Sequence, residues 1–165
     1  MFDDLLRENY RYAAQFSLAG IPAPAAKHLA LVTCMDSRIE PLAMLGLVPG
    51  DAKILRNAGG RVTQDVLRSL VLATAFLGVE RIAIMQHTKC AMAFRSDEEI
   101  RAELSVDHAE EASTWEFLAM PDPDAALAAD VARCRECDLI PSCVPIEGWR
   151  YSVDTGAIAQ VIGAN

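Results

Sequence analysis

Apolar residues in the middle of the chain occur in short continuous runs that alternate with segments of helical periodicity. Three such runs are typical of strands buried on both faces of a sheet: residues 28–33, 53–55 and 81–86. Before the last run, residues 63–77 place apolar side chains along one helical face, and Gly78 is a typical helix stop. Residues 38–45 predict a shorter helix that ends at Gly46. Strands and helices in this alternating order indicate a parallel sheet.

The N-terminal segment has a different pattern. Residues 3–18 repeat apolar side chains at helical spacing, and Asp3 or Asp4 is available as the cap. Two prolines exclude a helix over residues 20–26. We therefore expect residues 1–26 to form a helical arm followed by a loop, set apart from the main body.

The last third of the chain adds helices and a hairpin. Residues 96–104 predict a helix whose acidic first turn lies at the positive end of the helix dipole. Asp122 and Pro123 are a suitable cap and first residue for a further helix. The expected core residues of that helix are Leu127, Val131 and Cys134. Residues 144–153 and 158–161 flank a turn and predict a hairpin at the sheet edge.

Together these elements predict an α/β fold. We expect a mainly parallel central sheet flanked by helices, with an antiparallel edge strand and the N-terminal helical arm. A chain of 165 residues is long enough for one compact domain that buries about two-thirds of its unfolded surface. We therefore expect a single domain over residues 1–165.

Charge and composition narrow the class of partner and the compartment. The chain has 15 basic and 23 acidic side chains, a net charge of −8, and lacks the basic clusters that bind nucleic acid. Residues 70–79, the longest apolar stretch, are about half as long as a membrane span, and the acidic N-terminus is unlike a signal peptide. Five cysteines are an odd number, unlike a fully paired extracellular framework. We expect a cytoplasmic protein with neither nucleic acid nor membrane as partner.

Three side chains with metal-ligating atoms come directly after predicted strands. Cys34 follows the first strand, and His87 and Cys90 follow the third. Ligands of open parallel sheets bind beyond the carboxyl ends of the strands, where the strand order reverses, so we expect one shared crevice. Two thiolates and an imidazole suit zinc, and three protein ligands with one open position are typical of a catalytic zinc site. A single buried cysteine is more often a small apolar residue, so the prediction depends on all three together.

Asp36 and Arg38 lie two and four residues after Cys34. A carboxylate so close to a ligand can accept a hydrogen bond from zinc-bound hydroxide, or it can bind the metal as a fourth ligand and close the site. Arg38 can hold that carboxylate in a bidentate pair and keep it ionised. We therefore expect Asp36 and Arg38 to be catalytic, beside one zinc ion per chain.

Three motifs together resemble the signature of the β-class carbonic anhydrase family: Cys34-Met-Asp-Ser-Arg38, Arg56-Asn-Ala-Gly-Gly60 and His87-Thr-Lys-Cys90. The similarity is strong over residues 28–92, and residues 148–156 are similar to the family's last strand and turn. The chain is short for the family and resembles its compact bacterial members and, equally, its carbonyl sulfide hydrolase branch.

The resemblance implies that Cys34, His87 and Cys90 ligate zinc and that Asp36 with Arg38 forms the gating dyad. The implied reaction is the reversible hydration of carbon dioxide to bicarbonate and a proton, by attack of zinc-bound hydroxide. Members of the family assemble as dimers or higher oligomers with active-site clefts at the subunit interface. A homodimer or homotetramer is therefore implied, with the N-terminal helix of each chain embracing the partner.

A small apolar slot beside the zinc would hold the linear substrate. The two glycines of the second motif permit positive φ and a close backbone approach, so that loop could line the cleft. The expected slot residues are Gly59, Gly60, Val62, Leu67 and Met92. The residue after Cys90 is commonly glycine in the family and is Ala91 in this chain, which adds one methyl group near the metal.

Two alternative functions stay open. A hydrolase of carbonyl sulfide or carbon disulfide would need the same zinc site and the same apolar slot. A catalytically silent protein could bind zinc structurally or sense redox state through the same three ligands. Arg38 argues against this second alternative, because a structural site has no use for an ion-paired carboxylate beside its open position.

Other candidate groups stay without an assigned role. Cys134, Cys137 and Cys143 suggest a second metal or a redox pair, but three cysteines lack a fourth ligand. Histidine side chains ordinarily titrate near neutral pH, so His108 is a candidate proton shuttle. A surface histidine without that role is the simpler interpretation.

Overall fold

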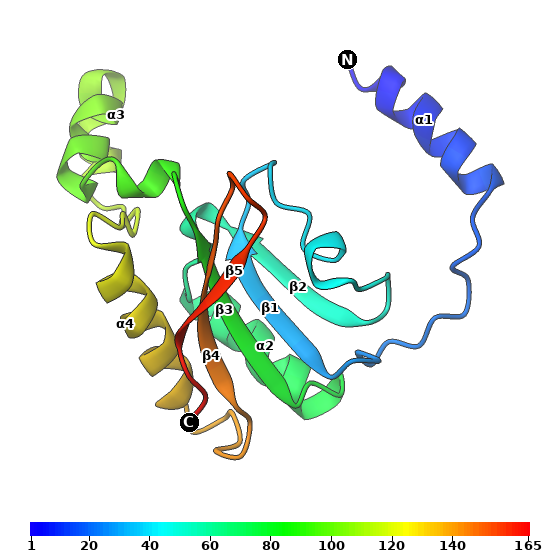
Figure 1. Cartoon of the computed structure of the whole chain (residues 1–165). Coiled ribbons are helices and arrows are strands. Elements are labelled where there is room, and N and C mark those ends of the chain that lie inside the picture. The colour runs from blue at the N-terminus through cyan, green and yellow to red at the C-terminus, as the bar shows by residue number, and fades with distance from the viewer.

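The computed structural model describes residues 1–165, apart from the side chains of residues 105–109. It is an α/β fold built on a five-stranded sheet with the order β2-β1-β3-β4-β5 (Figure 1). The strands are β1 (Leu29–Cys34), β2 (Ala52–Asn57), β3 (Arg81–His87), β4 (Ile146–Tyr151) and β5 (Ile158–Ile162). The first four pair in parallel, and β5 pairs antiparallel to β4. The predicted fold class is confirmed.

Helices connect the strands and cover one face of the sheet. The α-helices are α1 (Asp3–Ala14), α2 (Gln64–Phe76), α3 (Asp97–Ala112) and α4 (Pro123–Arg135). Single turns of 3-10 helix lie in the loops: η1 (Ala43–Leu45), η2 (Ala58–Gly60) and η3 (Ala91–Ala93). Helix α2 contacts β1, and α4 contacts β3 and β4. Helix α3 projects beyond the carboxyl ends of the strands (Figure 1).

Local side chains set where the helices begin. The Thr63 hydroxyl accepts a backbone N–H of the first turn of α2, and the Asp122 carboxylate accepts two such groups in α4. Ser96 and Glu99 exchange side-chain and backbone hydrogen bonds ahead of α3, which makes a capping box. The predicted starts of these three helices are therefore confirmed to within one residue, although α3 continues eight residues beyond the expected end at 104, to Ala112.

Two local expectations are wrong. Residues 38–45 do not form an α-helix, and only the single turn η1 is helical before Gly46 ends it at φ 65°. Pro41 lacks the backbone N–H and disfavours helical geometry at Glu40, so the apolar pattern there does not produce a helix. His28 takes φ 54°, outside the extended region, so β1 begins one residue later than expected, at Leu29.

The sheet separates two apolar layers. On the helix-covered face, β-strand residues pack against α2 and α4; the largest members of this cluster include Val32, Ile84, Leu70, Leu127 and Ile146. On the other face, Leu31 and Met85 pack against the segment that follows β1, including Ile39. All six residues of β1 are buried, as the continuous apolar run indicated. Each fully buried aliphatic side chain contributes about 1.5–3 kcal/mol, so β1 is a major contributor to the stability of the core.

The N-terminal helix stands away from the sheet (Figure 1). None of its residues is buried, and the apolar side chains of Phe2, Leu5 and Leu6 are 67, 63 and 58% exposed. Helix α1 ends at Ala14, four residues before the predicted end, and the proline-containing segment 20–26 is non-helical as expected. Within the described part of the chain, none of the helices is long and apolar enough to cross a bilayer.

Candidate metal centre

The predicted zinc ligands lie at the point where the strand order reverses. Cys34 is the last residue of β1 and His87 is the last residue of the neighbouring strand β3, with Cys90 three residues further on. From β1 the chain first runs to β2 on one side and then to β3 on the other, which places this end of the sheet at the switch point. The ligand atoms of Cys34, His87 and Cys90 all lie within 4.8 Å of one another, and all three residues are buried.

The imidazole of His87 is oriented for metal binding. Its Nδ1 lies 2.9 Å from the carbonyl oxygen of Thr88, which only accepts hydrogen bonds, so Nδ1 carries the proton and Nε2 has the free lone pair. Nε2 is buried and makes no hydrogen bond to any described residue. An unpartnered buried acceptor is costly, and a metal ion between the three side chains would satisfy it. The donor set therefore fits zinc.

The two thiols favour different protonation states. The neighbouring Cys90 thiol lowers the pKa of Cys34, although burial opposes it, and the nearby His87 side chain and the N–H groups of Asp36 and Gly59 add to the lowering. The same contact with Cys34, together with burial, raises the pKa of Cys90. Zinc favours thiolate ligands, so metal binding at this site would require both cysteines in the deprotonated form.

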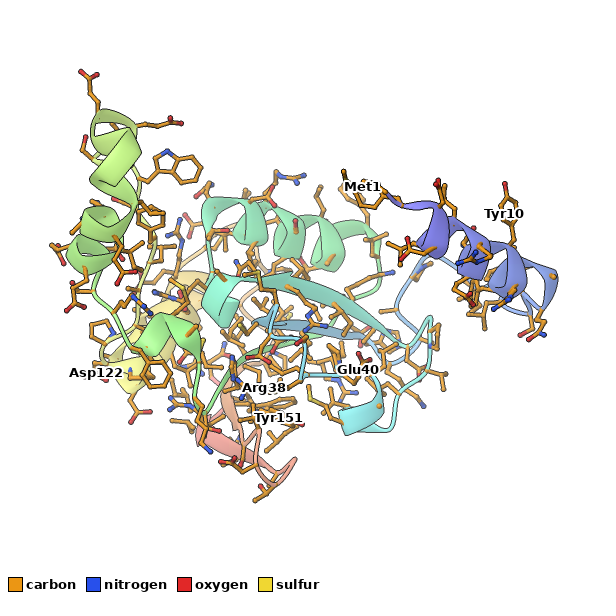
Figure 2. The ribbon with its side chains drawn as sticks, turned by 90° about the horizontal axis from the view of Figure 1, so that it is seen from above. Met1, Tyr10, Arg38, Glu40, Asp122 and Tyr151 are labelled. Atoms are coloured by element: carbon orange, nitrogen blue, oxygen red, sulfur yellow. The ribbon has the colours of Figure 1, made fainter. Side chains whose placement is uncertain are left out.

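Asp36 and Arg38 form the predicted bidentate pair beside these ligands. Arg38 donates from Nε to Oδ1 at 2.9 Å and from Nη2 to Oδ2 at 2.6 Å, and its backbone N–H also reaches Oδ1. These hydrogen bonds hold the pKa of the Asp36 carboxyl well below its usual range. The Oδ2 atom lies 3.8 Å from Nε2 of His87. Figure 2 shows Arg38 on the part of the molecule that contains the sheet, away from Met1 and from Tyr10 of α1.

A loop with two left-handed glycines packs against the ends of β1 and β3. Gly59 and Gly60 have φ 77° and 67°. A Cβ on Gly60 would lie 3.0 Å from the backbone nitrogen of Cys34 and 3.0 Å from the carbonyl oxygen of Met85. The double glycine predicted a close backbone approach, and Gly60 makes it to the backbones of β1 and β3 beside the candidate centre. No side chain larger than that of glycine fits there.

A cavity of about 360 Å³ opens onto the centre. Its lining residues are Cys34, Met35, Asp36, Ser37, Arg38, Ala58, Gly59, Cys90, Ala91 and Met92. Two of the expected slot residues, Gly59 and Met92, are among them. Val62 and Leu67 belong instead to the core cluster beneath α2 and α4, and Gly60 is buried against the strands. Val62 and Leu67 therefore do not form the wall of the slot, contrary to the prediction. The chain turns after Gly60, and both side chains pack on the helix-covered face of the sheet.

The structure adds residues that were not expected from the sequence. Arg56 donates to the carbonyl oxygens of Cys34 and Asp36, at 3.0 and 2.7 Å, and so fixes the backbone that carries both groups. Arg61 pairs with Asp130 at 2.6 Å, with side chains only 12 and 5% exposed, and this pair anchors the glycine loop to α4. The sequence feature that could have indicated the role of Arg56 is a charged residue near the end of an otherwise mainly apolar strand.

The remaining cysteines lie apart from the centre. All five cysteines are free, and Cys134 is buried in the core face of α4 as predicted. Burial raises the pKa of Cys134 to about 12, so its thiol is a poor nucleophile and a poor metal ligand. His108, the other residue considered for proton transfer, lies outside the residues whose side chains are described.

Comparison with known protein families agrees with this geometry. The family model described as carbonic anhydrase matches residues 29–115, which include all three candidate ligands and the Asp36–Arg38 pair. The chain is 33% identical to Beta-carbonic anhydrase 1 of Mycobacterium tuberculosis over 159 residues, covering 96% of each protein. It is also 34% identical to the carbon disulfide hydrolase of Acidianus sp. over 155 residues, covering 80% of this chain and 76% of the hydrolase.

Solved structures of similar proteins have the same fold as this chain. The crystal structure of a carbonic anhydrase from Streptococcus mutans superposes with a TM-score of 0.91 at 39% identity, covering 97% of this chain and 96% of that one. An apo form of carbon disulfide hydrolase superposes with a TM-score of 0.73 at 30% identity, covering 96% and 89% of the two chains.

Proposed function

This chain belongs to the β-carbonic anhydrase family, and on that premise we propose that it is a zinc lyase that hydrates carbon dioxide reversibly to bicarbonate and a proton. One observation carries the proposal. The Sγ atoms of two cysteines and the unpartnered Nε2 of His87 converge within 4.8 Å, directly beside a carboxylate that an arginine keeps ionised. Structural zinc sites are usually closed by four side chains and have no need of such a pair.

In this proposal, Cys34, His87 and Cys90 hold zinc through Sγ, Nε2 and Sγ. When bound, the ion supplies the Lewis acidity that makes water a nucleophile near neutral pH. Asp36 accepts a hydrogen bond from the attacking water, and Arg38 keeps the carboxylate ionised and fixes its orientation. A bond forms between the water oxygen and the carbon of carbon dioxide, one C=O electron pair moves to oxygen, and the proton leaves to solvent.

The cavity beside the ligands suits a small linear substrate. Met35, Ala58 and Met92 contribute apolar lining, while Asp36 and Arg38 supply the polar side. We propose Gly59 and Met92 as substrate-contacting residues. Ala91, at the start of η3, adds a methyl group to the same lining.

Carbon disulfide hydrolysis is the second candidate function, because hydrolases of that substrate are among the relatives. Both reactions need the same ligands and an apolar slot. Relative turnover of carbon dioxide, carbonyl sulfide and carbon disulfide by the purified zinc protein decides between them. A preference of tenfold or more for either sulfur compound over carbon dioxide would reassign the substrate.

We further propose a cytoplasmic homodimer or homotetramer in which each single-domain chain holds one zinc ion and α1 embraces the partner. The exposed apolar side chains of α1 support this role, since a solvated monomer gains nothing from them. The tetrameric β-carbonic anhydrases of Sordaria macrospora are structural neighbours at 18% identity, which supports the shared fold.

The first experiment combines metal analysis with rapid-mixing carbon dioxide hydration. We expect one zinc per chain, and loss of hydration on removal of the metal by a chelator with recovery on adding zinc back. Cys34→Ser should lose zinc. Asp36→Ala and Arg38→Ala should keep zinc but lose about 100-fold or more in turnover, the usual effect of removing a proton-handling group.

Matched controls are available in the same chain. Asp65 and Arg68 form an exposed aspartate–arginine pair in α2, with a contact of 2.7 Å, so Asp65→Ala and Arg68→Ala should leave turnover unchanged. Cys143 is an exposed free cysteine, and Cys143→Ser should keep its zinc. Undiminished turnover in both Asp36→Ala and Arg38→Ala would contradict the role assigned to that pair.

A further inference from the structure

Two successive backbone carbonyls orient groups on both sides of the candidate metal centre. The carbonyl oxygen of Thr88 accepts the Nδ1 hydrogen of His87 at 2.9 Å, and the carbonyl oxygen of Lys89 accepts from Nη2 of Arg38 at 3.2 Å. The positions of the imidazole and of the guanidinium beside Asp36 therefore both depend on the direction of the Thr88–Lys89 backbone.

That backbone is held in an unfavourable conformation. Lys89 has φ 55°, in the left-handed region that residues other than glycine seldom adopt. Such a conformation is unfavourable and persists only where the surrounding structure fixes it. Some contact outside the loop must therefore hold residues 88 and 89 in place.

The turn between β4 and β5 supplies that contact. The backbone N–H of Thr88 donates to the carbonyl of Tyr151 at 2.9 Å, and the backbone N–H of Val153 donates to the Thr88 hydroxyl oxygen at 3.1 Å. The Lys89 ammonium also pairs with Asp154 at 2.6 Å, but these two side chains are 60 and 56% exposed. Exposed ion pairs contribute little, so the Thr88 hydroxyl is the side-chain contact on which the loop depends.

We propose that the β4–β5 turn positions the metal loop, and that the Thr88 hydroxyl is the positioning group through which it acts. By fixing the Thr88–Lys89 backbone, this contact aligns His87 for the metal and Arg38 for Asp36. The inference rests on the proposed function, because it takes His87 as a zinc ligand. It assigns to residues 151–154, far along the chain, a role in a centre that they do not touch as ligands.

Thr88→Val tests the proposal, because it keeps the side-chain shape and removes the hydroxyl. We expect zinc affinity, measured by competition with a chromogenic chelator, to fall about tenfold, the lower end for groups that orient metal ligands. The visible spectrum of the cobalt(II)-substituted protein should also change, because the ligand orientation changes. Thr88→Ser restores the hydroxyl and should restore both readouts.

Thr74→Val is the matched control. The Thr74 hydroxyl bonds only to carbonyls of its own helix α2, so this variant should keep the zinc affinity and the cobalt spectrum of the unmodified protein. If Thr88→Val proves too unstable to purify, Thr88→Ala removes the same hydroxyl without a second methyl group in its place, and it should shift both readouts in the same direction.

Three outcomes would overturn the inference. Unchanged affinity and spectrum in Thr88→Val, or in Thr88→Ala where that variant replaces it, would show that the loop does not depend on the Thr88 hydroxyl. Failure of Thr88→Ser to restore binding would show that side-chain shape, not the hydroxyl, matters. Absence of zinc binding by the unmodified protein would remove the proposed function as well, which distinguishes that failure from the other two.

Discussion

At the scale of the residue, the candidate centre depends on positions where the backbone leaves no room for a side chain. Gly60 combines φ 67° with an approach to β1 and β3 so close that a Cβ would lie 3.0 Å from the backbone atoms of Cys34 and Met85. Backbone atoms in the middle of a sheet cannot move aside as the end of a flexible side chain can. Gly46 has nearly the same φ, 65°, but open space around it.

Gly60→Ala should therefore destabilise the protein by about 3–5 kcal/mol, because a clash with two strands adds to the cost of a left-handed alanine. Gly46→Ala should lower the free energy of unfolding by only about 1 kcal/mol, because the left-handed conformation of the alanine is then the sole cost. Urea denaturation of both variants measures the difference. Equal losses in the two variants would show that the close approach at Gly60 is not constraining.

At the scale of the element, one buried carboxylate and one partly buried carboxylate connect helices to distant loops. Asp130 in α4 accepts from Arg61 and from the backbone N–H of Val62, which fixes the glycine loop. Asp97 at the start of α3 accepts the backbone N–H groups of Phe117 and Ala119 at 2.9 and 2.8 Å. The Asp97 hydrogen bonds therefore connect the start of α3 to the segment that leads into α4.

Asp97 gives this tie a defined pH dependence. Burial raises the pKa of Asp97, but the N–H groups of Ala119 and Phe117 outweigh it, so the pKa is lowered in the folded protein. A group with a lowered folded-state pKa contributes stability above its unfolded pKa of about 3.9, and that stability is lost as the pH falls through the folded value. The contribution should therefore be constant from pH 7 to about pH 5.

Asp97→Asn keeps one acceptor oxygen and loses the charge, so we expect it to cost about 1–2 kcal/mol at pH 7. The difference from the unmodified protein should shrink below about pH 4, as the sign of the shift requires. Thermal unfolding between pH 3 and pH 7 measures it. Asp65→Asn, which changes an exposed carboxylate in α2, is the control and should cost less than 1 kcal/mol. A loss in Asp97→Asn that grows towards low pH would contradict this account.

At the scale of the whole molecule, helix α1 is the element that the fold of one chain leaves unburied. Helix α1 buries none of its residues and stands apart from the sheet, joined to β1 by a proline-containing segment (Figure 1). Its residues Leu5 and Leu6 are more than half exposed. A short helix in water gains most of its stability from packing of its apolar face. Helix α1 therefore needs another surface against which that face can pack.

Leu5→Glu combined with Leu6→Glu should shift the protein to a smaller species in sedimentation velocity, because it adds two charges to the surface proposed to contact the partner. Arg7→Glu changes the net charge by the same two units on the opposite side of the helix and should leave the oligomer intact. A monomeric unmodified protein, or equal dissociation by both variants, would contradict the proposed role of the arm.

Much of the candidate site was predictable because its residues are adjacent in sequence to strand ends. The apolar runs that indicate β1 and β3 end directly before Cys34 and His87, and parallel pairing of neighbouring strands brings those ends together. Asp36 and Arg38 pair within one turn, so their contact needed only local geometry. Val62 and Leu67 were misplaced, because their direction depends on two left-handed glycines whose conformation periodicity does not describe.

The sequence by itself determined the α/β class, the succession of strands and helices along the chain and the candidate ligating residues, because period and residue chemistry are local properties. Only the tertiary structure decided how those atoms are held. Arg56 reaches the carbonyl of Cys34 across 22 residues, Thr88 meets Val153 across 65, and Arg61 meets Asp130 across 69. Contacts over such separations exist only after the sheet has formed, since the chain between them must first be folded into helices and strands that bring the partners within hydrogen-bond distance.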